Sequence, residues 1–190
     1  MQIHQVSANH VVEEDRILLR INTIDGQEFR AWLTRRMTGA LWPALHHTLT
    51  ELLLRMDARL AVGDESDPLK RSMLADFQRD SLLGSSDFSR PFRTDSVNLP
   101  LGEHPLLVTD VQVSQPREHV VRLDFSDKLA AQAGGAAVSP RSFSVDLDAP
   151  LMQGMMHLID QAVLKADWQL PAPEALRSRE AASPAARVLN

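Results

Sequence analysis

Length and composition describe an ordinary globular protein. The chain has 190 residues, of which 44% are hydrophobic and 24% are charged. These proportions exclude wholesale disorder and a fibrous repeat. Cysteine is absent, which excludes disulfides, thiolate metal sites and cysteine nucleophiles. The net charge of −5 argues against sequence-independent binding of polyanions by the whole surface.

Targeting signals are not evident. Residues 1–16 lack the basic start and apolar stretch of a signal peptide. No segment approaches the ~20 consecutive apolar residues that a membrane-spanning helix needs. We therefore expect a cytoplasmic protein.

The first predicted element is a β-hairpin. Apolar and polar side chains alternate over residues 16–23, which is the period of a half-buried strand. Asp25-Gly26 follows, a dipeptide that supplies the two positive-φ positions of a type I′ turn. Residues 27–33 form the expected return strand. The hydroxyl of Thr34 can then cap a helix.

A long amphipathic helix is expected after Thr34. Apolar side chains recur there with a period of 3.6 residues. The stripe consists of Met37, Leu41, Leu45, Leu49, Leu52, Leu53, Met56 and Leu60. Pro43 lies inside the stripe and removes one backbone hydrogen bond, so we expect a kink there or a short first segment with a restart at Pro43.

Residues 62–105 form a connector with one short helix. Asp67-Pro68 is a good helix opening, and Gly84 is the expected stop. The polar stretch 85–93 that follows is predicted to be a loop.

The second half repeats the pattern of the first. Strands are expected over residues 107–113, 119–125 and 142–147, with a long loop over 128–141. Asp148 is the expected cap of a second amphipathic helix, with Pro150 in its first turn. Residues 171–190 are rich in Ala, Pro, Arg and Ser, which predicts a flexible tail.

We interpret this similarity as an internal duplication. At an offset of 114 positions (143 − 29), eight residues of one half match residues of similar class in the other. The first set is Phe29, Ala31, Leu33, Thr34, Met37, Leu41, Leu45 and Leu49; the second is Phe143, Val145, Leu147, Asp148, Leu151, Met155, Ile159 and Val163. The alternative, that any two amphipathic segments look alike, stays open.

The predicted fold class is α+β. We expect two related halves, residues 1–61 and 106–170, each with about three strands and one helix. Strands grouped before each helix favour an antiparallel sheet, or two packed sheets, with the helices on one face. As topology only, this order resembles the Whirly-type single-stranded nucleic-acid binders. No Whirly sequence motif is present.

Motifs of catalysis, metal binding or cofactor binding are missing. His46 and His47 are adjacent and diverge by roughly 100° on a helix, and no histidine pair has the i, i+4 spacing of a helical zinc site. Neither the Gly-x-Ser-x-Gly elbow nor a glycine-rich phosphate loop occurs. We therefore expect no metal and no cofactor, and an enzyme without a recognisable motif is the least favoured hypothesis.

Strand parity predicts a candidate interaction surface. If the apolar residues of the first hairpin face the helices, a basic and aromatic set points to the other side of the sheet. This set consists of Arg16, Leu18, Arg20, Arg30 and Trp32, with Arg35 and Arg36 nearby at the helix start. Such an arrangement can stack a nucleobase on the indole and hold phosphates with the guanidinium groups.

Two structural interpretations of this surface compete with nucleic-acid binding. Acidic residues at the equivalent positions of the second half, such as Asp124 and Asp146, can pair with Arg20 and Arg30 across strands. Alternatively, Trp32 is buried against another subunit.

A weaker candidate lies in the predicted loop over residues 85–93. It interleaves Phe88 and Phe92 with Arg90 and Arg93. This mixture suits a peptide or a nucleic acid, but two phenylalanines that anchor a loop to the core are the commoner outcome.

The sequence thus favours a non-catalytic interaction or assembly protein that self-associates through an open sheet face. The expected partner is a second copy or another protein, and single-stranded nucleic acid is the alternative. No membrane partner is expected.

Overall fold

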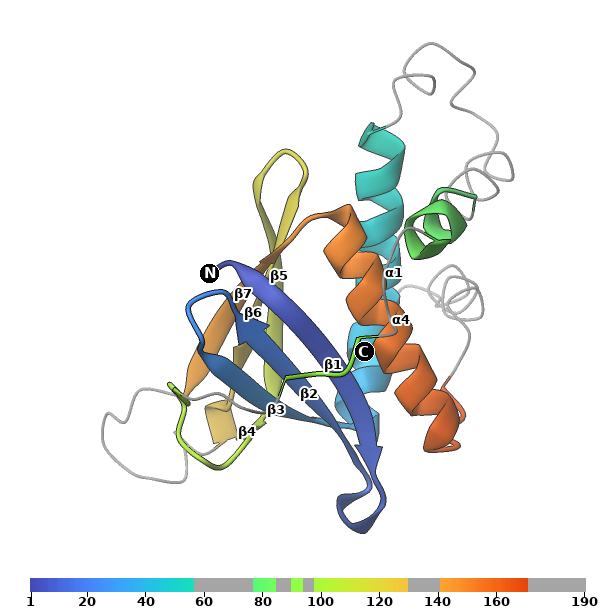
Figure 1. Cartoon of the computed structure of the whole chain (residues 1–190). Coiled ribbons are helices and arrows are strands. Elements are labelled where there is room, and N and C mark those ends of the chain that lie inside the picture. Colours follow the sequence, from blue (N-terminus) through green and yellow to red (C-terminus); the bar gives the residue numbers. More distant parts are fainter. Residues whose placement is uncertain (57–76, 85–89, 94–97, 130–140, 171–190) are drawn as a thin grey trace, which may run out of the picture.

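The fold is mixed α+β, with two sheets that are mainly antiparallel and three helices among the described residues (Figure 1). The computed structural model describes residues 1–56, 77–84, 90–93, 98–129 and 141–170. Several sequence predictions lie outside these ranges: the helix opening at Asp67-Pro68, Phe88, most of the loop over 128–141, and the tail over 171–190.

Sheet 1 has four strands in the order β1-β2-β3-β4. Its strands are β1 (Ile3–Val11), β2 (Arg16–Thr23), β3 (Glu28–Thr34) and β4 (Leu106–Leu107). The pairs β1–β2 and β2–β3 are antiparallel, whereas β3 and β4 are parallel. A short 3-10 helix, η1 (Val12–Glu14), links β1 to β2.

Sheet 2 is an antiparallel sheet of three strands in chain order. It contains β5 (Asp110–Arg117), β6 (Val120–Ser126) and β7 (Ser142–Leu147). The predicted single strand over residues 107–113 is therefore wrong, because the chain changes sheets inside it. The amide of Val108 donates to the carbonyl of Trp32 in sheet 1, and the amide of the next residue, Thr109, donates to that of Ser126 in sheet 2.

Both long helices begin at the predicted caps. The amide of Met37 donates to Thr34 Oγ1 at 3.1 Å at the start of α1 (Arg35–Met56). The amide of Leu151 donates to Asp148 Oδ1 at 3.0 Å at the start of α4 (Ala149–Lys165). α1 runs without interruption through Pro43, so the predicted restart there is wrong. Residues 77–84 form a further helical segment.

The turn between β2 and β3 differs from the predicted type I′. Gly26 has a φ of 73°, but Asp25 does not share this left-handed conformation. The amide of Gly26 donates to the carbonyl of Thr23 at 3.1 Å, and the amide of Thr23 donates to that of Gln27 at 2.9 Å. The hairpin is therefore confirmed, with one positive-φ position where a type I′ turn needs two.

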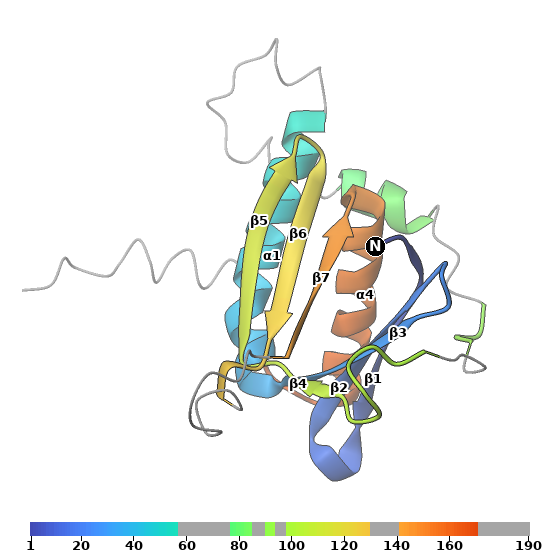
Figure 2. The same ribbon diagram turned by 90° about the vertical axis from the view of Figure 1, so that its left-hand side faces the viewer.

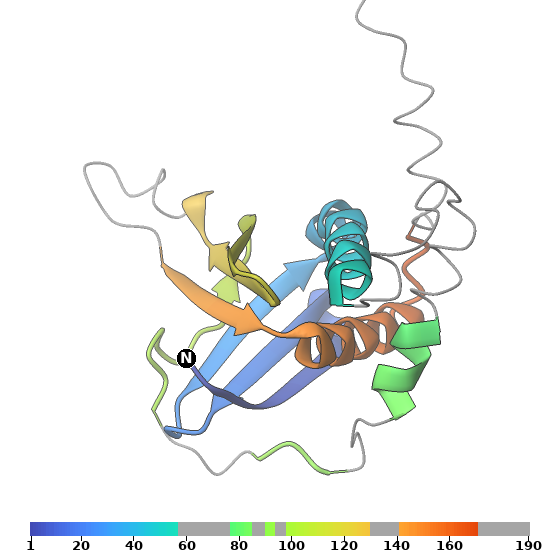
Figure 3. The same cartoon turned by 90° about the horizontal axis from the view of Figure 1, so that it is seen from above.

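The core lies between the two sheets and the two long helices. α1, α4 and sheet 2 all lie on the same side of sheet 1 (Figure 3). A perpendicular view shows α1 behind β5 and β6, and α4 next to β7 (Figure 2). The ring of Phe143 stacks on both Phe29 and Phe125, with centroids 5.2 Å and 5.0 Å apart, and so joins the sheets. In the helices of the described residues, no segment is long and apolar enough to span a lipid bilayer.

The C-terminal end of the described chain is fixed to the turn between β1 and β2. Trp168, only 5% exposed, donates its indole N–H to Asp15 Oδ1 at 2.8 Å. This hydrogen bond holds the pKa of Asp15 below its usual value. The indole also meets the ring of His10 edge-on at 5.9 Å. Trp168 thus links the C-terminal end of the described chain to the β1–β2 turn, 153 positions earlier in the sequence.

Candidate interaction surface

The candidate surface is the face of sheet 1 that points away from the helices, hereafter the outer face. Paired residues place four rows of side chains on it. From one end to the other, the rows are Gln5, Asn22 and Glu28; Ser7, Arg20 and Arg30; Asn9, Leu18 and Trp32; and Val11, Arg16 and Thr34. Strand parity therefore placed all five predicted sheet residues on one face correctly.

Arg20 and Arg30 share one carboxylate. Each donates from Nε to Glu28 Oε1 at 2.7 Å, and the Glu28 side chain is completely buried. Burial by itself would raise the pKa of Glu28, but the hydrogen bonds from the two arginines outweigh it and hold the pKa below its usual value. The cluster of two guanidinium groups and one carboxylate therefore carries a net charge of +1.

The segment over residues 90–93, hereafter the strap, crosses one end of the outer face. Gln5 holds it at two points, donating from Nε2 to the carbonyl of Pro91 at 3.2 Å and accepting from the amide of Arg93 at 3.0 Å. Asn22 donates from Nδ2 to the carbonyl of Arg93 at 3.0 Å. The strap is visible on the side of sheet 1 away from the helices (Figure 3).

Phe92 anchors the strap by a different contact from the predicted one. Its ring lies 4.4 Å from the guanidinium carbon of Arg20, a cation–π contact rather than a core contact. The strap, Arg20 and Glu28 therefore form one connected unit, which fills the strap end of the outer face.

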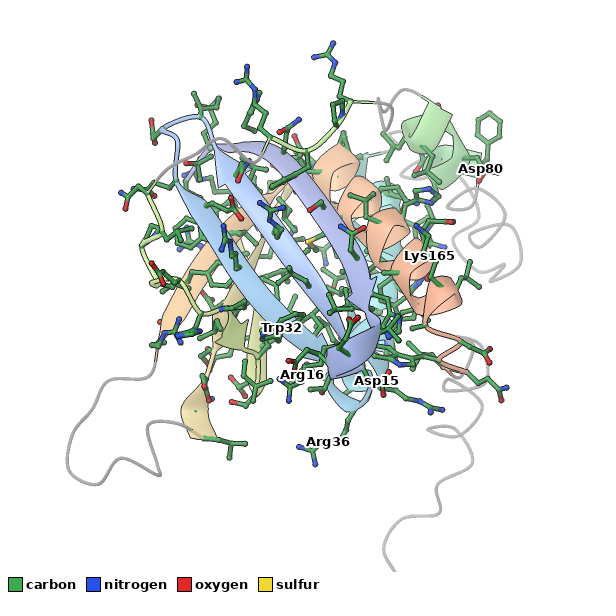
Figure 4. All side chains as sticks on the ribbon, turned by 60° about the horizontal axis from the view of Figure 1, so that its bottom comes forward. Asp15, Arg16, Trp32, Arg36, Asp80 and Lys165 are labelled. Atoms are coloured by element: carbon green, nitrogen blue, oxygen red, sulfur yellow. The ribbon has the colours of Figure 1, made fainter. Side chains whose placement is uncertain are left out.

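The other end of the outer face is the Trp32 end, defined by Asn9, Val11, Arg16, Leu18 and Trp32. Its three apolar side chains are half-buried and do not belong to the hydrophobic core of the molecule. Arg16 lies 3.5 Å from the carboxylate of Glu14. Trp32, Arg16 and Arg36 gather at this end of the sheet (Figure 4).

The predicted pairing of Arg20 and Arg30 with acids of the second half is wrong, because the two sets of strands form separate sheets. Asp146 instead accepts two hydrogen bonds from Arg122, at 2.6 Å and 2.8 Å. Asp124 accepts a short hydrogen bond from Ser144. The ion pairs of Arg20, Arg30 and Arg122 thus form within each sheet rather than between the sheets.

Sequence reasoning missed the residues that organise the strap end. Glu28 could have been found, because it lies two positions before Arg30 and so shares its face. The contacts of Gln5 and Asn22 with the strap gave no local signal, since 86 and 71 residues separate Gln5 from Pro91 and Asn22 from Arg93.

The remaining predicted residues divide between the two ends. Arg35 and Arg36 are exposed at the start of α1, beyond the Trp32 end. Arg90 and Arg93 belong to the strap.

Within the described part of the chain, no group of three His, Asp or Glu side chains could hold a metal ion.

In comparisons with known proteins, the chain matches no protein-family model, no curated protein and no solved structure.

Proposed function

We propose that this protein is a non-catalytic assembly protein that self-associates through the Trp32 end of the outer face. The observation that carries the proposal is the row formed by Leu18 and Trp32. These large apolar side chains lie outside the core although they sit in the middle of a four-stranded sheet. Apolar residues clustered on such a face are typical of protein interaction sites.

The charges around this row favour a protein partner over a polyanion. Arg20 and Arg30 are held by Glu28, and Arg16 lies beside Glu14. An apolar centre with neighbouring charges of both signs suits an isologous contact, in which the same patch on two copies must complement itself. A second copy is therefore the preferred occupant.

Trp32→Asp is expected to abolish self-association. A buried tryptophan at the centre of an interface typically contributes at least about 2 kcal/mol, so its loss weakens association by roughly thirtyfold or more. Sedimentation velocity over a range of concentrations would show assemblies of the native protein and a monomer of the variant. Circular dichroism would confirm that the variant is folded.

Ile24→Asp is the matched control. Ile24 is 58% exposed and follows β2 at the opposite end of the hairpin, so the same substitution there should leave assembly unchanged. A native protein that stays monomeric at high concentration would disprove the proposal. So would equal assembly by the two variants.

Single-stranded nucleic acid is the second candidate partner, and one observation favours it. Arg35 and Arg36 directly follow β3 and are exposed. Arg16 and Arg36 lie at the same end of the sheet as Trp32 (Figure 4). Binding of labelled oligonucleotides, followed by fluorescence anisotropy, should then weaken with salt, with a slope of about −0.7 per phosphate contact. Arg35→Ala with Arg36→Ala should flatten that slope, whereas Arg122→Ala on sheet 2 should not. Absence of binding at low salt excludes this function.

We also infer that the two halves arose by duplication and share a Whirly-like order of elements. The pairing registers support this inference. Leu19 lies opposite Ala31 in sheet 1, as Leu123 lies opposite Val145 in sheet 2. The outward side chains differ between the copies, which supports a binding role for the outer face of sheet 1 alone.

A further inference from the structure

A pocket at the C-terminal end of α4 lies away from the outer face. Its walls come from α4, from residues 167–170 and from Trp42 on α1; it is open to solvent and has a volume of about 500 Å³. That volume lies within the range of roughly 300–1,000 Å³ that is usual for small-molecule sites. The pocket is therefore large enough to take a ligand.

Apolar and polar side chains share the walls of the pocket. Trp42 and Trp168, which are 6% and 5% exposed, each contribute a small exposed part of an indole ring, and Leu164 adds an apolar side chain that is 72% exposed. Indole faces carry negative electrostatic potential and attract organic cations. Neither Lys nor Arg is among the described residues that line the pocket.

Asp160 provides a partly buried negative charge among the residues that line this pocket. Burial raises its pKa to about 6, and no hydrogen bond or ion pair to Asp160 occurs among the described residues. A carboxylate that loses solvation without gaining a partner is unfavourable, so the arrival of a cation would be favoured. With a pKa of about 6, the carboxylate is mostly ionised at neutral pH and can pair with a cation.

We propose that this pocket binds a small organic cation of the alkylammonium class. The ammonium group pairs with Asp160, and the hydrocarbon part lies against Trp42 and Trp168.

Two other titratable groups, His157 and Asp167, also line the pocket, and His46 contacts the ring of Trp42 from α1. Protonation of either histidine would add positive charge and weaken the binding of a cation.

Isothermal titration calorimetry with three ligands of similar size tests this proposal. Hexylammonium, hexanol and hexanoate share a hydrocarbon chain and differ in charge. Hexylammonium should bind about tenfold more tightly than hexanol at about pH 8, while hexanoate should bind most weakly. This preference should become much smaller at about pH 5, because most Asp160 side chains are then protonated.

Asp160→Asn should reduce the affinity for hexylammonium to that for hexanol. Asp167→Asn is the matched control, because it removes one negative charge from the same pocket at an exposed position and should have a smaller effect. Equal binding of hexylammonium and hexanol by the native protein would overturn the proposal, as would unchanged binding by the Asp160 variant or no binding at all.

Discussion

Glu28→Ala is expected to lower the free energy of unfolding by about 2–4 kcal/mol. The substitution leaves Arg20 and Arg30 side by side without their shared carboxylate, and removing one partner of a buried ion pair typically costs about 3–5 kcal/mol. The arginine side chains are 18% and 30% exposed, so water offsets part of that cost. Urea unfolding followed by circular dichroism measures the change.

Two matched variants separate charge from size at this position. Glu28→Gln keeps the shape and one hydrogen-bond acceptor but removes the charge, so it should fall between the native protein and Glu28→Ala. Asp146→Ala breaks the corresponding pair of sheet 2, where Arg122 is 41% exposed, and should cost less. If Glu28→Ala and Asp146→Ala destabilise equally, the shared carboxylate has no special role.

The same carboxylate predicts how stability depends on pH. Because the pKa of Glu28 is lower in the folded protein than its usual value of 4.5, its contribution is fully present above that value. It is lost as the pH falls through the folded-state pKa. The native protein should therefore lose more stability than Glu28→Gln when the pH falls below about 4.5.

Local patterns were sufficient to predict most elements of the fold. Alternation over residues 16–23 predicted the bounds of β2, and the hydroxyl of Thr34 and the carboxylate of Asp148 predicted both helix starts, because strand parity and helix capping depend on a few neighbouring residues. The change of sheet at Val108 was missed. It depends on hydrogen bonds to Trp32 and Ser126, which are distant in the sequence.

The sequence predicted which residues share the outer face of sheet 1, but not how that face is divided. Parity brought Arg20, Arg30 and Trp32 together, but the strap divides that face into two ends with different properties. One end is filled by Phe92 and the backbone of residues 90–93, and the other keeps Leu18 and Trp32. The periodicity of a strand does not indicate which distant segment crosses the sheet. The division of the outer face by the strap could therefore not be predicted from the sequence.

Trp168→Ala is expected to destabilise the protein by about 3 kcal/mol. Trp168 is 5% exposed, and truncating a buried tryptophan typically costs about 3–5 kcal/mol. The low end applies because the ring also lines the pocket, where side chains and solvent can move into the vacated space. Thermal unfolding followed by circular dichroism measures the loss. Binding of hexylammonium should also fall, since one indole wall is gone.

The hydrogen bond from Trp168 to Asp15 is tested separately from the burial of the ring. Trp168→Phe keeps most of the apolar area but removes the N–H donor, so it should cost less stability than Trp168→Ala.

The acceptor of this hydrogen bond is tested at Asp15, which has a φ of 44°, a conformation that Gly and Asn tolerate. Asp15→Asn keeps an acceptor and should be more stable than Asp15→Gly, which has none. Equal stability of these two variants would mean that burial of the ring, rather than the hydrogen bond, holds the C-terminal segment against the β1–β2 turn.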